Sequence, residues 1–134
     1  MAKSNKRFRL PKRPGEQWIE IYPGYYLSSE GRWYSRHFCS LIKQFPNSSG
    51  YYRVTVKIDG NRKQVFTHIK VVEQFGDINN TYPPEGSRSL FEYGLSIDHL
   101  DGNKKNNAKA NLELISHKLN CRRRELRYRY SNLV

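Results

Sequence analysis

The sequence has no run of apolar residues long enough to cross a bilayer, which takes about 18 or more, and no apolar stretch follows its basic N-terminus. These absences predict a protein with neither a membrane-spanning helix nor a secretory signal. Cysteine is scarce as well: Cys39 and Cys121 are the only two, and neither belongs to a Cys-x-x-Cys pair. A structural zinc site is therefore not expected. Two reduced thiols fit a cytoplasmic protein.

Acidic residues are half as numerous as basic ones, with 12 Asp and Glu against 24 Lys and Arg and a formal net charge of +12. A positive field of this size concentrates polyanions, and nucleic acid is the commonest polyanion that a small protein meets. Hydrophobic residues make up only 37% of the chain, which predicts a thin, loop-rich structure. The length of 134 residues fits one domain or two small modules.

Changes in composition divide the chain into four predicted segments. Lys and Arg dominate the first, short β-favouring runs the second and turn-forming residues the third, and the fourth joins two short apolar runs to a basic helical pattern. The predicted segments are a flexible basic arm over 1–15, an N-terminal module over 16–76, a linker over 77–92 and a C-terminal module over 93–134.

In the N-terminal module, short β-favouring runs separated by turn residues predict a small antiparallel sheet followed by one helix. Strands are expected over 18–22, 25–27, 32–35, 41–45, 51–58 and 63–66. The dipeptide Asp59-Gly60 predicts a tight hairpin between the last two strands. Ile69, Val72 and Phe75 then follow a helical period, with Thr67 as the expected N-terminal cap and Gly76 as the stop signal.

The C-terminal module is predicted to run strand, loop, strand, helix. The strands are expected over 95–100 and 111–115, with a polar loop over 101–110 between them. Ser116 is the expected cap of a basic helix that continues to about Arg127. The complete chain therefore belongs to the α+β class on this interpretation.

An acid beside a histidine, Asp98-His99, ends the first strand of this module. Neighbouring side chains point to opposite faces of a regular strand, so both can serve one site only where the strand ends or bends. Asp98 offers a hard oxygen ligand for Mg²⁺ or Mn²⁺, and the imidazole of His99 can accept a proton near neutral pH. Asn120, in the first turn of the following helix, can bring an amide oxygen to the same site as a second ligand.

The pattern Asp-His-x-Asp-Gly-Asn-x-x-Asn-Asn over 98–107, followed by Asn111-Leu112 and then by Ser-His-x-x-Asn over 116–120, resembles the HNH nucleases with a ββα-metal fold. Within that family the similarity is to intron-encoded homing endonucleases of phages and bacteria. It extends over about 97–124. Residues 16–76 resemble the small nuclease-associated DNA-binding module that often precedes an HNH site.

The resemblance implies a small antiparallel sheet with one helix, followed by a ββα-metal HNH unit. It implies that Asp98 and Asn120 bind one divalent metal ion, Mg²⁺ or Mn²⁺, that His99 is the general base, and that Asn111 holds the loop that orients His99. The implied activity is hydrolysis of phosphodiester bonds in double-stranded DNA by a homing-type enzyme. A monomer with one active site would nick one strand. No small-molecule cofactor is expected.

Six basic residues are predicted to contact DNA, and three of them follow Asn120 by three, four and seven positions, on the same side of the predicted helix. The predicted set is Arg32, Lys118, Arg122, Arg123, Arg124 and Arg127. A solvated basic helix face is the alternative interpretation of the helical members. His68, His117 and aromatic residues such as Tyr51 are expected to serve packing, and Asn107 to serve the turns of its loop.

Two other functions stay open at this point. One is a non-catalytic basic nucleic-acid-binding protein, either a decayed nuclease or an RNA-associated structural protein. Decay usually removes the acid, the base or the metal ligand first, and this chain retains Asp98, His99 and Asn120. The other is a toxin nuclease, which would need a partner inhibitor and a delivery region.

Overall fold

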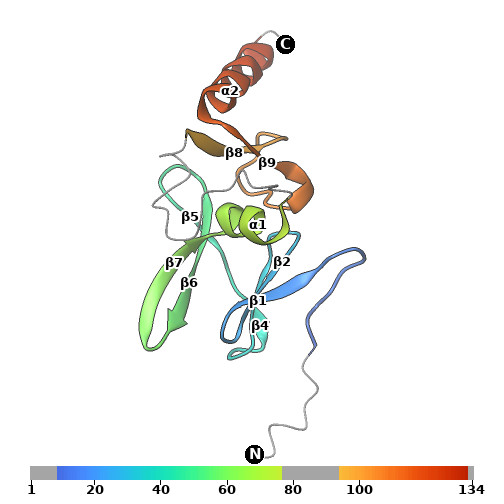
Figure 1. Cartoon of the computed structure of the whole chain (residues 1–134), viewed down its shortest axis with the longest axis vertical. Coiled ribbons are helices and arrows are strands. Elements are labelled where there is room, and N and C mark those ends of the chain that lie inside the picture. Colours follow the sequence, from blue (N-terminus) through green and yellow to red (C-terminus); the bar gives the residue numbers. More distant parts are fainter. Residues whose placement is uncertain (1–8, 77–93, 133–134) are drawn as a thin grey trace, which may run out of the picture.

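A computed structural model of the chain describes residues 9–76 and 94–132, and it contains two antiparallel sheets, a central helix and a C-terminal hairpin that leads into a second helix. Figure 1 shows the central helix between the N-terminal sheets and the C-terminal hairpin, with the second helix at the end of the molecule away from these sheets. The predicted α+β class is therefore the observed one. The predicted linker over 77–92 and the first eight residues of the predicted arm lie outside the described residues.

The first sheet is a four-stranded antiparallel meander. Its strands are β1 (Trp18–Tyr22), β2 (Tyr25–Ser28), β3 (Trp33–Ser35) and β4 (Ser40–Leu41). Leu27 and Trp33 from neighbouring strands are fully buried, and they form the centre of the core. Burial of these large apolar side chains is the main force that holds the thin sheet together.

The second sheet has three strands, so the N-terminal module contains two sheets rather than the single one expected. Its strands are β5 (Phe45–Pro46), β6 (Tyr52–Ile58) and β7 (Asn61–Phe66). The predicted strand over 41–45 is wrong, because Leu41 ends β4 and Phe45 begins β5. Between them, Ile42 packs against the core and its backbone N–H donates to the carbonyl oxygen of Trp33, which binds this point of the chain to the first sheet.

The hairpin of β6 and β7 turns at Asp59-Gly60, as predicted. Both residues have positive φ, 50° and 81°, which is the conformation of the tight turns that match strand twist. Val54, Val56 and Val65 are buried against the first sheet. The opposite face of the hairpin is left for polar and charged side chains, because side chains alternate between the two faces of a strand.

Helix α1 (Thr67–Phe75) follows β7 directly. The expectation that Thr67 caps this helix is wrong: Phe66, whose side chain cannot form a capping hydrogen bond, occupies the N-cap position. The hydroxyl of Thr67 instead accepts a hydrogen bond from the indole Nε1 of Trp33 at 3.0 Å and donates one to the side-chain oxygen of Gln44. Thr67 therefore joins the helix to the first sheet. The helix stops before Gly76, as predicted.

The C-terminal module begins with the two-stranded hairpin of β8 (Leu95–His99) and β9 (Leu112–Ser116). A loop and the short 3-10 helix η3 (Lys109–Asn111) connect the strands, and helix α2 (His117–Asn132) follows. The hydroxyl of Ser116 accepts the backbone N–H of Leu119 at 3.2 Å, which confirms Ser116 as the helix cap. Helix α2 continues five residues beyond the expected end at Arg127.

The two modules pack directly against each other. Helix α1 contacts β9 and η3. The turn between β2 and β3 supports the 101–110 loop, because the backbone N–H of Lys109 donates to the carbonyl oxygen of Ser29 at 2.7 Å and Gly31 lies against Asn107. Lys104 from the same loop donates to the carbonyl oxygen of Ser49 at 2.7 Å. The N-terminal module therefore helps to shape the loop that follows His99.

We predict that Gly31→Ala destabilises the fold more than Gly60→Ala. Both glycines have left-handed φ, +78° and +81°, so the two substitutions share the same backbone strain. A Cβ on Gly31 would lie 2.8 Å from the Cβ and the carbonyl oxygen of Asn107, whereas a Cβ on Gly60 meets no atom of the described residues within 4 Å. The contact should lower the free energy of unfolding by about 1–3 kcal/mol more for Gly31→Ala, measured by urea denaturation. Equal losses in the two variants would contradict this account of the module contact.

Candidate active site

The end of β8 carries both residues of the Asp-His pair. Asp98 and His99 are buried, with 2% and 5% of their surfaces exposed. Asp98 faces α2, and so does Ser96 two positions earlier, whereas His99 lies against the 101–110 loop and α1. Asp98 and His99 therefore lie on opposite sides of the strand end. Helix α2 covers Asp98, and the 101–110 loop with α1 covers His99.

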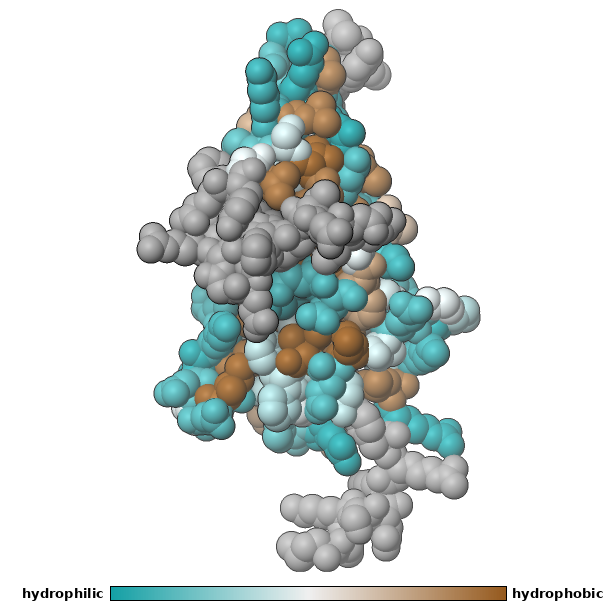
Figure 2. Space-filling view, in the orientation of Figure 1, coloured by the Kyte–Doolittle hydropathy of each residue, from teal (hydrophilic) through white to brown (hydrophobic). Residues whose placement is uncertain are grey.

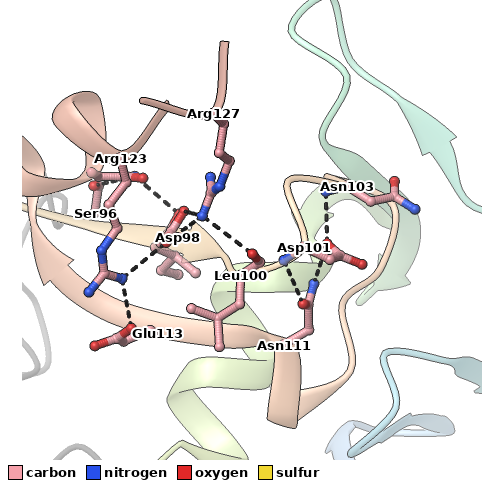
Figure 3. Close-up of polar contacts among 11 residues, drawn as sticks. Ser96, Asp98, Leu100, Asp101, Asn103, Asn111, Glu113, Arg123 and Arg127 are labelled. Carbon is pink, nitrogen blue, oxygen red and sulfur yellow. Dashed lines mark hydrogen bonds and ion pairs between the residues drawn. The ribbon is translucent and has the colours of Figure 1, made fainter. Parts of the chain in front are cut away.

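The Asp98 carboxylate is held by two guanidinium groups of α2. Arg127 donates to its two oxygens at 3.1 and 2.9 Å, and Arg123 donates to Oδ2 at 3.1 Å. Figure 3 shows both side chains reaching from the helix to the carboxylate, and Arg123 also lies 2.8 Å from Glu113 on β9. Burial alone would raise the pKa of Asp98, but these hydrogen bonds and charges outweigh it, and the pKa lies below its ordinary value. Asp98 is therefore an anion at neutral pH.

The side-chain amide of Asn120, in the first turn of α2, is oriented by hydrogen bonds to β8. Its Nδ2 donates to the hydroxyl of Ser96 at 2.8 Å and, more weakly, to the carbonyl oxygen of Ile97 at 3.4 Å. Its Oδ1 is buried and has no hydrogen-bond partner among the residues that the structure describes. A buried acceptor without a partner is unfavourable unless a ligand completes it. Ser96 and Asp98 face the same side of β8, so this oxygen belongs to the same side as the Asp98 carboxylate.

The donor set of this side fits a hard divalent cation. Carboxylate and amide oxygens are the ligands that Mg²⁺ and Mn²⁺ prefer, and the orphaned oxygen of Asn120 is placed for a partner that the chain itself does not supply. Within 9–76 and 94–132, no group of three or more His, Cys, Asp or Glu side chains gathers as a metal site. Asp98 and Asn120 would therefore hold an ion only together with water or substrate oxygens.

The imidazole of His99 has one nitrogen engaged by the loop. Its Nε2 lies 2.7 Å from the side-chain oxygen Oδ1 of Asn107. An amide oxygen only accepts hydrogen bonds, so Nε2 carries the proton and the basic lone pair is on Nδ1. Burial lowers the pKa of His99 below its ordinary value, although the hydrogen bond to Asn107 acts in the opposite direction. The ring is therefore neutral at physiological pH and able to accept a proton.

Asn111 ties the loop back to the residues after His99. Its Oδ1 accepts the backbone N–H of Asp101 at 3.0 Å, and its Nδ2 donates to the Asp101 carboxylate and to the carbonyl oxygen of Asn106, both at 2.9 Å. The backbone N–H of Leu100 donates to the carbonyl oxygen of Asn111 at 2.8 Å. Figure 3 shows Asp101 and Asn111 beside each other, to the right of the Asp98 carboxylate. Asn111 thereby closes the loop on the strand that carries His99.

A cavity of about 210 Å³ opens beside these groups, and its wall brings His99, Asn120 and Arg127 together. The other lining residues are Tyr51, Ile97, Gly102, Lys104 and Arg124. The cavity is therefore lined by a neutral imidazole, by the residue whose amide oxygen lacks a partner, and by several cations. A phosphate group in such a place would meet a base on one side and positive charge on the other.

Five of the six basic residues predicted to contact DNA lie together on α2. Lys118, Arg122 and Arg124 are exposed, and Arg123 and Arg127 are partly exposed beside Asp98. Figure 2 shows hydrophilic side chains along one side of the α2 end of the molecule, next to apolar ones. Helix α2 is therefore the strongest candidate for contacts with a phosphate backbone.

Arg32 is the member of the predicted set that lies elsewhere. Its guanidinium pairs with Glu16, whose side chain is fully buried, with Nε donating to Oε2 at 2.8 Å, and it also donates to the carbonyl oxygen of Pro11. Burial raises the pKa of Glu16, but the hydrogen bond from Arg32 contributes most to lowering it to about 2. Because the Arg32 guanidinium is held in this ion pair, we do not include Arg32 in the candidate DNA surface.

Sequence reasoning missed three residues of the site. Asn107 was interpreted as a turn residue, although it carries the hydrogen bond to His99, and its position within the motif was the one available signal. Tyr51 and His68 were assigned to packing, yet their rings lie 5.9 and 5.6 Å from the His99 ring. They lie far upstream of the motif, and no local pattern connects them to it.

A hairpin whose first strand ends in Asp-His, followed by a helix whose first turn carries Asn, is the ββα arrangement that the resemblance implied. Residues 65–122 match the family model described as HNH endonuclease. The matched residues comprise α1 and most of the C-terminal module, so this part of the chain is similar to the HNH endonuclease family.

Two phage proteins are similar over most of the chain. One is the H-N-H endonuclease F-TflI of Escherichia phage T5, 29% identical over 98 residues that cover 73% of this chain and 45% of that protein. The other is the DNA endonuclease I-HmuI of Bacillus phage SP01, 33% identical over 107 residues that cover 78% of this chain and 55% of that protein. The chain therefore spans about half the length of these curated relatives.

The fold is also similar to a solved structure. That structure, titled "DNA binding and cleavage by the HNH homing endonuclease I-HmuI", matches with a TM-score of 0.63 and 29% sequence identity, over 83% of this chain and 59% of the other. The relatives and the structural match are all HNH endonucleases, which agrees with the family resemblance of the motif. None of the helices in the described ranges is long and apolar enough to cross a membrane.

Proposed function

We propose that this chain is a divalent-metal-dependent endonuclease that hydrolyses phosphodiester bonds and nicks one strand of double-stranded DNA. The observation that carries the proposal is that His99 and Asn120 line one cavity, that the buried Oδ1 of Asn120 has no hydrogen-bond partner among the described residues, and that Asp98 precedes His99 on β8. The names of the relatives, H-N-H endonuclease and DNA endonuclease, support the same reaction class. The chain is proposed to act as a monomer with one active site.

Asp98 and Asn120 would hold one divalent ion, Mg²⁺ or Mn²⁺. When bound, the ion stabilises the negative charge that develops on the phosphate and on the departing 3′ oxygen. In the free protein, Arg127 and Arg123 balance the charge of Asp98, at 2.9 and 3.1 Å from Oδ2. Both guanidinium groups are about one-third exposed, so they can also reach a phosphate next to the site.

His99 would act as the general base. Since Nε2 already donates to Asn107, the proton of the attacking water moves to Nδ1, the nitrogen with the free lone pair. The water oxygen bonds to phosphorus as the bond from phosphorus to the 3′ oxygen breaks, and the departing 3′ oxygen takes a proton from solvent water, which leaves a 5′ phosphate and a 3′ hydroxyl. Burial keeps the ring neutral before the reaction, so the base is ready to accept a proton at neutral pH.

The DNA surface would combine the basic side chains of α2 with the outer face of the β6–β7 hairpin. Lys57 and Arg62 are paired across the two strands and exposed, and Arg53 lies on the same face, where it donates to Gln64 at 3.0 Å. These cations add to the net charge of +12. Contacts of this kind position a protein on the phosphate backbone without reading its sequence.

We expect the purified chain to convert supercoiled plasmid into nicked circles with Mg²⁺ or Mn²⁺, and to leave it intact with EDTA. Restoring excess Mg²⁺ after EDTA should restore nicking, because the chelator removes only the ion. Gel electrophoresis of the plasmid forms checks this, with DNA binding measured in parallel by fluorescence anisotropy. Binding without cleavage under every metal condition would favour the non-catalytic nucleic-acid-binding protein. Linear product without a nicked intermediate would contradict the single-strand nick.

A further inference from the structure

Three side chains from different elements surround the ring of His99. Asn107, in the loop after β8, accepts its Nε2–H at 2.7 Å. Tyr51, just before β6, and His68, in the first turn of α1, stack on each other with ring centroids 4.7 Å apart and planes 20° apart. The His99 ring is tilted against both, at 5.9 Å from Tyr51 and 5.6 Å from His68.

The side-chain amide of Asn107 has a hydrogen-bond partner for its oxygen but none for its nitrogen among the described residues. The residue is 2% exposed, and its Oδ1 accepts from His99, while its Nδ2 is buried with no hydrogen-bond partner in the part of the chain that the structure describes. Leaving an amide nitrogen unpaired is unfavourable, so a residue that served only to fill space would be better apolar. The hydrogen bond to His99 therefore explains why residue 107 carries an amide rather than an apolar side chain.

Tyr51 and His68 form a neutral aromatic wall. Burial, with a smaller contribution from His99, lowers the pKa of His68 to about 3, so this imidazole brings no charge to the site at neutral pH. Lys104, from the same loop as Asn107, lies 4.7 Å from the centroid of the Tyr51 ring and donates to Ser49, which fixes the wall to the loop. The wall therefore limits the rotation of His99, and Asn107 selects which of its nitrogens carries the proton.

We propose that Asn107, Tyr51 and His68 are positioning residues that hold the His99 imidazole in one orientation and in the Nε2–H tautomer, with Nδ1 kept free for the attacking water. This inference rests on the proposed function of His99 as general base. It also assigns the N-terminal module a part in the chemistry, because Tyr51 and His68 both precede the 77–92 segment. The module then contributes to the rate of the reaction as well as to DNA binding.

The first test compares Asn107→Leu with Asn107→Asp in the full chain. Leucine has a similar size and no acceptor, whereas aspartate keeps an acceptor oxygen for Nε2–H. In metal-free protein, ¹H–¹⁵N correlation spectra of the histidine rings report the tautomer of His99. Asn107→Leu should lose the pure Nε2–H signature and lower kcat for nicking about 10²-fold with little change in DNA affinity. Asn107→Asp should keep the signature and most of the rate.

The second test compares His68→Ala with His68→Phe. Alanine removes the wall and should lower kcat, whereas phenylalanine restores a ring and should recover much of the rate. His37→Phe is the matched control, because His37 also packs against a tyrosine, with its ring 5.7 Å from that of Tyr25, yet it is exposed and remote from the cavity. It should behave as wild type.

The spectra separate this inference from the proposed function. An Nε2–H signature in Asn107→Leu as pure as that of wild type, in a folded variant, would overturn the positioning role whether or not the wild type cleaves DNA. A wild type that never nicks DNA while its His99 shows the Nε2–H signature, lost in Asn107→Leu, would instead overturn the proposed function and leave the hydrogen bond established. Equal kcat values for wild type and His68→Ala would exclude the aromatic wall of Tyr51 and His68 as a positioning element for His99.

Discussion

His99→Ala is expected to lower the nicking rate about 10²- to 10⁴-fold, the usual contribution of a general base. The imidazole carries the free lone pair on Nδ1, since Nε2 is engaged by Asn107, and the described cavity wall offers no second neutral imidazole. DNA affinity should change little, because the neutral ring adds no charge to the surface that meets phosphate. Single-turnover nicking of plasmid, with anisotropy binding in EDTA, measures the two effects separately.

His37→Ala is the matched control for this variant. Its ring is exposed and lies against Tyr25 and the Pro23–Gly24 turn, on a part of the first sheet away from the cavity. The control should nick at the wild-type rate. Wild-type nicking by His99→Ala with Mg²⁺ present would remove His99 as the base and would also remove the reason for its hydrogen bond to Asn107.

The pH dependence of the wild type should report the same group. A general base must be deprotonated, so the nicking rate falls as pH is lowered through the pKa of His99. Burial holds that pKa below the ordinary value of about 6.5, so full activity should persist into mildly acidic solution before it declines. A rate that already declines at pH values above 6.5 would contradict the buried environment of the ring.

The arrangement of the candidate catalytic residues was predictable because it is local. Asp98, His99, Asn111 and Asn120 lie on one hairpin and the helix that follows it, where strand and helix periods decide which side chains meet. The cap at Ser116 and the turn at Asp59-Gly60 were predictable for the same reason. Each depends on a few consecutive residues whose backbone conformation is set by their own side chains.

The parts that sequence reasoning missed depend on contacts between distant segments. Tyr51 and His68 reach His99 only because α1 packs on β9 and η3, and no local pattern encodes that packing. Thr67 stands where a helix cap is expected, but its hydroxyl accepts a hydrogen bond from the buried indole N–H of Trp33, which needs an acceptor. The ion pair of Arg32 was missed for the same reason, because Glu16 is recognisable as its partner only once the first sheet has folded.

Asp98→Asn is expected to weaken Mn²⁺ binding strongly and to lower the nicking rate about 10²- to 10³-fold, since a metal ion stabilises a phosphoryl transition state by several kcal/mol. The substitution keeps the size of the side chain and removes its negative charge. The fold should survive, because Arg123 and Arg127, which lose their charged partner, are about one-third exposed and can be hydrated. DNA affinity should not fall, since both guanidinium groups become available to phosphate.

Glu113→Gln is the control that separates the metal ligand from its electrostatic surroundings. Glu113 is opposite Asp98 in the β8–β9 register and lies 2.8 Å from the same Arg123, yet its side chain is 45% exposed, whereas that of Asp98 is only 2% exposed. It removes one negative charge from the same arginine while leaving the oxygen donors of Asp98 and Asn120 in place. Calorimetric titration with Mn²⁺ should therefore be nearly unchanged for Glu113→Gln and clearly weakened for Asp98→Asn. Equal Mn²⁺ affinities for Asp98→Asn and wild type would exclude Asp98 as a metal ligand. The role of Asp98 would then be its ion pairs with Arg123 and Arg127.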